Sequence, residues 1–158
     1  MNAQIQEFWE ACCKALPDLS ANTPYTIKTY GNTEEMADLL LSLIREGEKT
    51  GTFAVDWEFE TAPETTPRQG DHVIVLDGRG APGCLYRLDS VEKLPFNKIT
   101  QQHVACEGPS MRELAPWRKM HWAYWTRVLD GTGHVPTEDM TVLVQNFRVL
   151  YPVASANL

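Results

Sequence analysis

The sequence predicts one α+β domain in which a small curved β-barrel is flanked by helices. Three observations predict this class: helical periodicity comes first along the chain, period-two segments follow, and one helical segment precedes a closing strand. With 158 residues, 43% of them hydrophobic, the chain can bury a sizeable core, so we expect residues 1–158 to form a single domain. Four or five strands with a bulge can curl into a small barrel.

Two amphipathic helices are expected before the strands. From Ile5 to Leu16, apolar residues recur every three or four positions, and Pro17 ends that segment. The second helix is expected to begin at Asn32, whose side chain can cap it, with Glu35 three residues later. Gly47 can take the left-handed conformation that ends this helix.

After Gly47 the period of the sequence changes from helical to two. Apolar and polar residues alternate over Thr52–Glu60, which predicts a strand with one buried and one polar face. Further strands are expected at His72–Leu76 and Cys84–Leu94. The run GRGAPG between them matches a dinucleotide-loop pattern, but Pro82 and a strand follow it in place of a helix. A hairpin turn is therefore expected there.

The C-terminal third of the chain is expected to hold one helix and the last strand. The helix is expected to start at about Pro116, because proline disrupts a helix that is already several residues long, and to reach Leu129. The strand covers Thr141–Tyr151. Its apolar residues change parity near Gln145 and Asn146, which predicts a bulge at that point.

The charge balance restricts the partners of the protein. There are 14 basic and 21 acidic residues, a net charge of −7, and such a field repels a long polyanion. We expect no coating of long nucleic acid, whereas a small ligand or one specific RNA element remains compatible with a local basic cleft. No apolar run is long enough to span a membrane and no leader segment is recognisable, so we expect a cytoplasmic protein that does not insert into membranes.

Neither cysteine nor histidine spacing predicts a metal site or another cofactor. The cysteines show no Cys-x-x-Cys pattern, and the histidines show no i, i+4 pair. Free thiols in a reducing compartment are the simplest interpretation. The four cysteines are Cys12, Cys13, Cys84 and Cys106, and the four histidines are His72, His103, His121 and His134.

The segment PWRKMHWAYWTR concentrates aromatic residues on a predicted helix. Trp117, His121 and Trp125 share one face, and Arg118 and Trp122 share the next. Such a surface can stack unpaired bases, but aromatic stripes at helical spacing are more often core. Both interpretations remain open at this point.

The stretch REGEKTGT places a lysine and two threonines between a helix end and a buried strand. Gly47 and Gly51 allow the backbone to turn tightly on either side of Lys49. If Gly51 introduces a turn or bulge, the side chains of Lys49 and Thr52 can meet. A lysine in that position can activate a hydroxyl, provided that burial or a neighbouring cation lowers its pKa.

The chain resembles the ASCH domain family, a relative of the PUA-like RNA-binding fold, and within it a longer bacterial branch. The resemblance rests on the order and spacing of TYGNTEEMADLL, GEKTGT, WEFE, GDHVIVLDGRGAPGC, LPFNKIT, HVACEG, WRKMHWAYW and EDMTVLVQNFRVLYP, and it covers nearly the whole chain. It implies a small β-barrel with flanking helices around a cleft. Two departures are Pro116, where the family favours a helix former, and EGPSMREL in place of an acidic, glycine-rich segment.

The resemblance also implies site residues. Some compact members resemble amidohydrolases that remove acyl groups from modified cytidine with a lysine, a threonine and a glutamate, which correspond here to Lys49, Thr52 and Glu107. His103 is expected beside Glu107 on a helix as a second polar contact. The same catalytic residues also allow an ion pair between Lys49 and Glu107, with Thr52 only starting a strand. The candidate ligand-binding residues are Thr50, Trp57, His103, Arg118, His121 and Trp122.

The sequence thus leaves three functions open. The first is hydrolysis of an amide on a modified nucleoside or nucleotide such as an N4-acylcytidine. The second is non-catalytic binding of RNA or a nucleotide in the same cleft, and other members of the family are described as RNA-binding proteins or ribonucleases. The third is an interaction domain with a vestigial cleft. No cofactor is expected in any of them.

Overall fold

The computed structural model describes residues 2–152. The helices are α1 (Ala3–Ala15), α2 (Glu34–Arg45), α3 (Gln101–Val104) and α4 (Leu114–Val128). The strands are β1 (Thr26–Thr29), β2 (Gly51–Val55), β3 (His72–Leu76), β4 (Pro82–Pro95) and β5 (Thr141–Tyr151). Within this range, no helix has the length and apolar character needed to cross a membrane.

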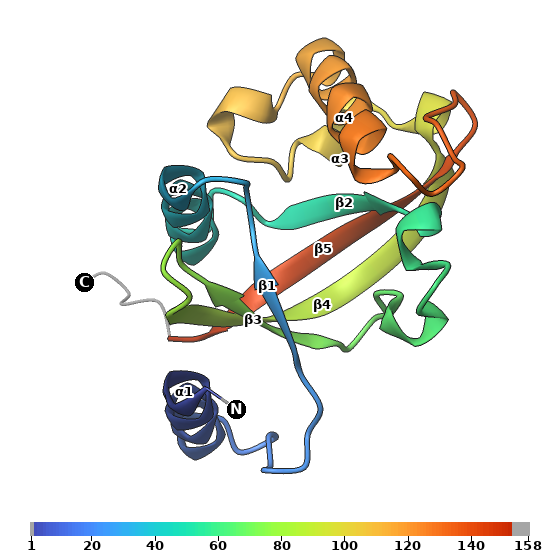
Figure 1. Ribbon diagram of the computed structural model, residues 1–158. Coiled ribbons are helices and arrows are strands. Elements are labelled where there is room, and N and C mark those ends of the chain that lie inside the picture. The colour runs from blue at the N-terminus through green and yellow to red at the C-terminus, as the bar shows by residue number, and fades with distance from the viewer. Residues whose placement is uncertain (1, 153–158) are drawn as a thin grey trace.

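All five strands belong to one mixed sheet of order β1-β3-β4-β5-β2. β1 runs parallel to β3, and the other three pairings are antiparallel. The sheet curls into a half-barrel (Figure 1), which makes β1 and β2 its two edge strands. The fold class is therefore α+β, as the sequence predicts. The expected hairpin also forms, because β3 and β4 pair as antiparallel neighbours across a turn at Asp77–Ala81.

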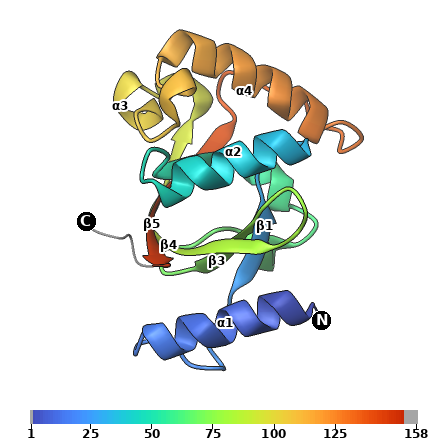
Figure 2. The same ribbon diagram turned by 90° about the vertical axis from the view of Figure 1, so that its left-hand side faces the viewer.

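Helices α1 and α2 pack on opposite faces of the sheet, and Figure 2 shows α1 below it and α2 above it. The alternation of β3 explains this arrangement. Ile74 packs in the core beneath α1 with Trp9, whereas Val73 and Val75 pack in the core against α2 with Ile44. A strand buried on both faces needs apolar residues at every position, which is what HVIVL supplies.

A third core lies under α4, at the end of the molecule that Figure 1 shows at the top. Trp117 and Trp125 of α4 are fully buried there against Phe96, Val142 and Val144. The aromatic stripe on this helix is therefore core. This answers the question that the sequence left open for Trp117 and Trp125.

The predicted strand Thr52–Glu60 is wrong beyond Val55. β2 ends at Val55 and the chain continues as a short 3-10 helix, Asp56–Phe59. The carboxylate of Glu58 accepts a hydrogen bond from the backbone N–H of Val55 at 2.7 Å, which turns the chain away from the sheet. The expected polar face is also wrong, because all five residues of β2 are buried.

Two helix starts differ from the expectation. The side chain that caps α2 belongs to Thr33, which accepts from Met36 N at 3.1 Å, and not to Asn32. Helix α4 begins at Leu114, two residues before Pro116. Proline is tolerated there because the first N–H groups of a helix have no intrahelical partner.

At the predicted place, near Gln145 and Asn146, the bulge lies on the neighbouring strand β4, and the irregularity of β5 itself falls later, at Leu150. In the β4–β5 ladder, Leu88 pairs with Phe147 and Ser90 with Asn146, so Asp89 is the extra residue. The change of parity in β5 has a different cause. Its Val144 packs in the core under α4, whereas Phe147 packs in the core against α2.

Candidate functional site

The GEKTGT loop is held between the segment that carries Glu107 and strand β5. Thr50 N donates to Cys106 O at 2.8 Å, and Phe147 N donates to Thr50 O at 2.9 Å. Gly51 is required at this junction, because a Cβ there would lie 2.5 Å from the Gln145 carbonyl oxygen and 2.7 Å from the Cys106 sulfur. The close approach of three chain segments therefore brings the lysine of this loop next to Glu107.

Lys49 forms a buried ion pair with Glu107. Its Nζ lies 2.7 Å from Glu107 Oε1 and also donates to the Gly51 carbonyl at 2.8 Å. Lys49 is only 4% exposed and Glu107 only 6%. Buried charges of this kind are stable in proteins only when they are paired and hydrogen-bonded, and both conditions are met here.

Helix α4 supplies the other contacts of the Glu107 side chain. Trp117 Nε1 donates to Glu107 Oε2 at 3.1 Å, and His121 Nε2 lies 3.5 Å from the same oxygen. His121 Nδ1 lies 3.0 Å from the Trp117 carbonyl, which can only accept, so Nδ1 carries a proton. Burial lowers the pKa of His121, against the opposing effects of Glu107 and the Trp117 carbonyl.

Arg112 joins the two segments that carry the ion pair. Its Nε donates to the Glu107 carbonyl oxygen at 2.7 Å. Its Nη2 donates to the Glu48 carbonyl oxygen at 2.5 Å and to Glu48 Oε2 at 3.0 Å. One guanidinium group thus fixes the backbone beside Lys49 relative to the backbone of Glu107, a task that suits its rigid fork of donors.

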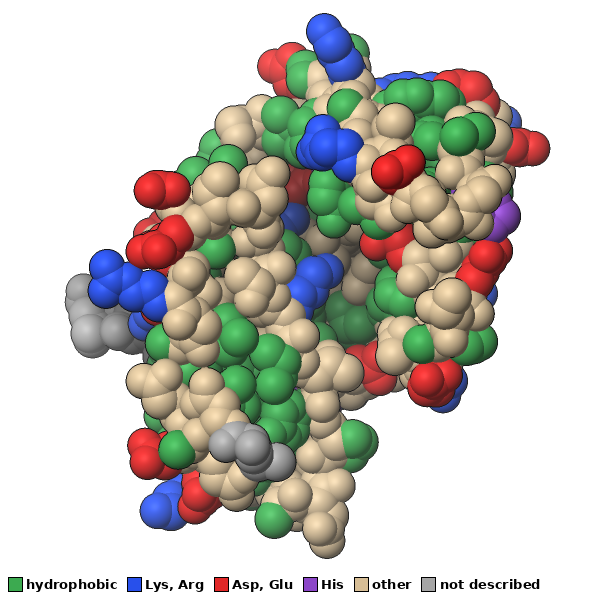
Figure 3. All heavy atoms as spheres, viewed as in Figure 1, with side chains coloured by type: hydrophobic (Ala, Val, Ile, Leu, Met, Phe, Trp, Pro, Cys, Tyr) green, Lys and Arg blue, Asp and Glu red, His purple; other side chains and the backbone are tan. Residues whose placement is uncertain are grey.

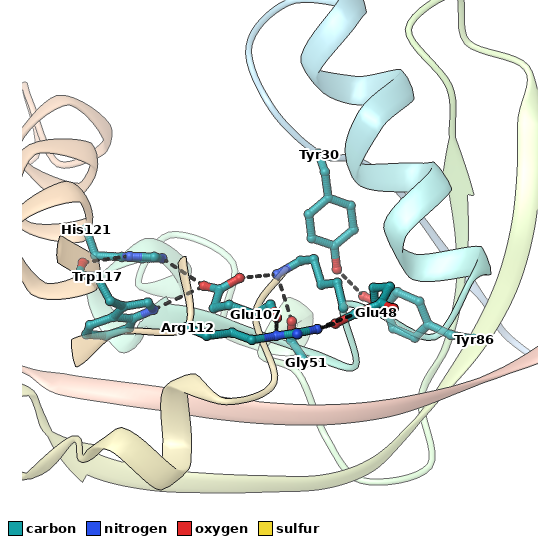
Figure 4. Close-up of polar contacts among 9 residues, drawn as sticks. Tyr30, Glu48, Gly51, Tyr86, Glu107, Arg112, Trp117 and His121 are labelled. Carbon is teal, nitrogen blue, oxygen red and sulfur yellow. Dashed lines mark hydrogen bonds and ion pairs between the residues drawn. The ribbon is translucent and has the colours of Figure 1, made fainter. Parts of the chain in front are cut away.

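Tyr30, which directly follows β1, closes the other side of the ion pair. Its hydroxyl lies 2.7 Å from the Tyr86 hydroxyl, and the Lys49 ammonium lies 5.6 Å from its ring centroid. In Figure 4, Tyr30 and Tyr86 lie toward α2, while Trp117 and His121 lie toward α4. Burial raises the pKa of Tyr30 well above its usual value, while the side chain of Thr52 acts in the opposite direction. Thr52 is itself buried, so its hydroxyl shares this polar interior.

Lys28 of β1 belongs to the same group of side chains. Its ammonium lies 4.5 Å from the Tyr30 ring centroid. Burial, followed by the positive charge of Lys49, lowers the pKa of Lys28 to about 8, while Glu58 acts in the opposite direction. Burial in turn raises the pKa of Glu58, whose Oε2 accepts from Val55 N and from Trp125 Nε1.

A hollow on the surface gives access to this region. Figure 3, viewed as in Figure 1, shows it at the centre of the face, over β1 and below the helices α3 and α4, with basic and acidic side chains inside. Edge strands β1 and β2 contribute Lys28 and Thr52 from opposite edges of the sheet.

The structure brings together only part of the residue set that the sequence suggested. Lys49, Glu107 and His121 are in contact, and Thr52 lies one residue after the carbonyl that Lys49 binds. The expected contact of His103 with Glu107 is wrong, because α3 ends at Val104. His103 instead accepts from Thr100 N at 2.8 Å and lies 3.7 Å from Glu92.

The remaining candidates lie outside this group. Trp57 stacks on His134 with ring centroids 4.3 Å apart. Arg118 pairs with Glu138 and, with Trp122, lines a shallow hollow over Phe96. Thr50 is exposed and contributes its backbone. All of them remain candidates whose role in binding is a prediction.

Sequence reasoning missed four residues of the group: Lys28, Tyr30, Glu58 and Arg112. The first two flank the end of a four-residue strand without apolar alternation, so no periodicity indicated them. Arg112 lies in EGPSMREL, the segment in which this chain departs from the family pattern, and that departure was the available signal. Among residues 2–152 there is no group of three or more His, Cys, Asp or Glu residues suited to a metal ion.

Comparison with known proteins agrees with this architecture. The family model of the ASCH domain matches residues 26–151, from β1 to the end of β5. The chain belongs to the ASCH domain family. Helix α1 lies before the matched region. No curated protein sequence matches this ASCH protein significantly.

Two solved structures are similar over almost the whole chain. One is the ASCH domain from Lactobacillus crispatus JV V101, with 25% identity, a TM-score of 0.82, and 94% of this chain and 95% of that chain covered. The other is protein EF3133 from Enterococcus faecalis V583, with 26% identity, a TM-score of 0.84, and 95% and 90% covered. α1 is thus part of a shared architecture, since both alignments extend beyond the ASCH match.

Proposed function

We propose that this ASCH protein binds a nucleoside or nucleotide in the hollow between β1, β2 and α4 and hydrolyses an acyl amide on its base. The observation that carries the proposal is the buried Lys49–Glu107 pair, in which Lys49 also binds the carbonyl of Gly51, the residue before the buried Thr52. A buried ion pair is expensive to maintain for stability alone, so a second role is a reasonable inference. An amide of the N4-acylcytidine type fits the residue set implied by the family resemblance.

The chemistry can be written with all protons assigned. Thr52 Oγ attacks the acyl carbon, and its proton passes to Lys49 as Lys49 gives a proton to Glu107, 2.7 Å away. The C–N bond then breaks, and the amine leaves with the proton from Glu107. Water hydrolyses the Thr52 ester, returns a proton to Thr52 and releases a carboxylic acid.

The second candidate function is binding without catalysis, and one observation favours it. Lys49 already donates to Glu107 and to the Gly51 carbonyl, so the ammonium has a structural role that needs no chemical step. In that case the pair fixes the shape of the hollow, and the hydroxyl of Thr52 has no chemical step to perform.

A hydrolysis assay on N4-acetylcytidine and its 5′-monophosphate separates the two candidates. Under the enzyme proposal, Thr52→Ala removes the attacking oxygen and should abolish turnover while the dissociation constant stays within about threefold. Lys49→Met should be equally inactive. Thr61→Ala, an exposed threonine outside the hollow, serves as the matched control and should keep wild-type turnover.

The contrary result is also well defined. If the wild type binds these compounds but shows no turnover above background, the enzyme proposal fails and the binding function remains. Turnover that survives in Thr52→Ala would instead remove threonine from the mechanism. An absence of both binding and turnover with cytidine derivatives would reject this class of ligand.

A further inference from the structure

Two lysines approach the same tyrosine ring, Lys28 from β1 and Lys49 from the loop before β2, and only Lys49 has a carboxylate partner. Lys49 lies 5.6 Å from the Tyr30 centroid and is neutralised by Glu107 at 2.7 Å. Lys28 lies 4.5 Å from that centroid, and within residues 2–152 no acceptor lies within hydrogen-bonding or ion-pairing distance of its ammonium. The group carries three N–H donors, and none of them is satisfied by this part of the protein.

The strand direction aims Lys28 at the hollow. Lys28 and Tyr30 are two residues apart, so they share one side of the β1 strand, and Lys28 pairs in register with Val75, which packs in the core on the α2 side of the sheet. Ile27, the residue before Lys28, points to the other side and is 47% exposed. Lys28 is the one basic residue of β1, and Figure 3 shows basic beside acidic and hydrophobic side chains in the hollow over that strand.

Glu58 favours the charged form of this lysine, against the larger effect of burial, without forming an ion pair with it. Its carboxylate is close enough to favour the protonated form of Lys28, yet it forms no ion pair with it and is held by Val55 N–H and the Trp125 indole. A partly buried cation with open donors is suited to an anionic group on a ligand. The same position has no evident structural purpose, because Lys28 ties no two segments together.

We propose that Lys28 binds the phosphate of the ligand, so that the preferred occupant of the hollow is a mononucleotide and not an uncharged nucleoside. This inference rests on the proposed binding of a nucleoside or nucleotide and adds its charge class. A phosphate within a longer RNA offers the same chemistry, but the net charge of −7 opposes a chain of phosphates more than a single one. We therefore commit to the mononucleotide.

The pH dependence of binding follows from the two partners. A phosphate monoester gains its second charge above a pKa of about 6, and Lys28 loses its charge above a pKa of about 8. Affinity should therefore be highest between these values and fall on both sides. The other charged groups around Lys28 are Lys49, which is paired with Glu107, and Glu58 after β2.

Calorimetry with four probes tests the proposal: cytidine, cytidine 5′-monophosphate, ribose 5-phosphate and a cytidine oligonucleotide of about six residues. We expect the monophosphate to bind the wild type at least about tenfold more tightly than cytidine, the strength of one charge-assisted contact. Lys28→Gln should reduce that ratio to below about threefold, and Lys28→Arg should retain most of it. Lys14→Gln, an exposed lysine on α1, is the matched control and should leave the ratio unchanged.

The other possible results separate the phosphate site, the mononucleotide assignment and the hydrolysis of an amide from one another. Equal affinity for cytidine and its monophosphate, or a ratio that survives Lys28→Gln, overturns the phosphate site while leaving amide hydrolysis untouched. Tighter binding of the oligonucleotide than of the monophosphate overturns the mononucleotide assignment. Ribose 5-phosphate binding that depends on Lys28 supports the phosphate site even if cytidine is the wrong base and no amide is hydrolysed, and a failure of every phosphate probe to bind rejects the site.

Discussion

A double-mutant cycle on Lys49 and Glu107 measures how strongly the candidate site depends on its ion pair. At 2.7 Å and an effective dielectric constant of about 20, two unit charges attract by ~6 kcal/mol before desolvation is subtracted. Desolvation offsets most of this, so the intact pair adds little net stability, but loss of one partner leaves a buried, unpaired charge. Lys49→Met should therefore cost about 3–5 kcal/mol of unfolding free energy.

Glu107→Leu should cost more than Lys49→Met. It leaves Lys49 unpaired and also removes the acceptor of the Trp117 indole N–H, which adds about 1–3 kcal/mol for an unsatisfied buried donor. In the double variant no unpaired charge remains. We therefore expect the double variant to be no less stable than Glu107→Leu alone, which corresponds to a coupling energy of at least about 3 kcal/mol.

Urea unfolding followed by circular dichroism supplies the four free energies. The exposed pair Arg118–Glu138, with nitrogen and oxygen 2.9 Å apart, is the matched control, and its cycle should give a coupling below about 1 kcal/mol. Additive costs for Lys49→Met and Glu107→Leu, within about 0.5 kcal/mol, would refute the claim that the two charges depend on each other.

Three further predictions concern the surroundings of the pair. Arg112→Ala should lower the unfolding free energy by about 1–3 kcal/mol, and Arg112→Lys should not restore it, because one ammonium cannot replace a fork that spans two carbonyl groups; thermal unfolding measures both. Because the folded pKa of Lys28 is about 8, below its usual 10.5, the unfolded chain binds more protons between pH 8 and 10, so the wild type should gain stability over Lys28→Gln across that range in urea titrations. His121 should be neutral at pH 7 with its proton on Nδ1, as nitrogen NMR can show, and because burial lowers its pKa, stability relative to His121→Gln should decrease as the pH falls below 6.5.

Hydrophobic periodicity predicted the elements that bury apolar faces, and it failed where a contact distant in the chain decides the structure. Alternation continues past Val55 in the sequence, but β5 pairs with β2 only from Gly51 to Val55, and Glu58 accepts a hydrogen bond from the backbone N–H of Val55. In β1, by contrast, a strand forms where the sequence pattern predicts none. Its residues TIKT lack apolar alternation, and they form a strand because β3 offers a parallel partner.

Only those residues of the candidate site that belong to a recognisable family motif could be predicted from the sequence. Lys49 and Glu107 came from the family resemblance, and their contact was one of the two interpretations that the sequence allowed. His121 was predicted as a ligand-binding residue, which stays a prediction, and the sequence did not indicate that its Nε2 lies 3.5 Å from Glu107. The position of Tyr30 depends on how β1 lies relative to β2, a distance that no local pattern encodes.

Strand β5 determines how the molecule unfolds. It pairs with β4 along one side and β2 along the other, and its side chains enter all three cores: Val144 under α4, Phe147 against α2, and Tyr151 against α1. No core can separate from the others without breaking this strand, so the amide protons of β5 should exchange with solvent only through global unfolding. The half-barrel would then melt as one cooperative unit, although its helices lie on different sides of the sheet.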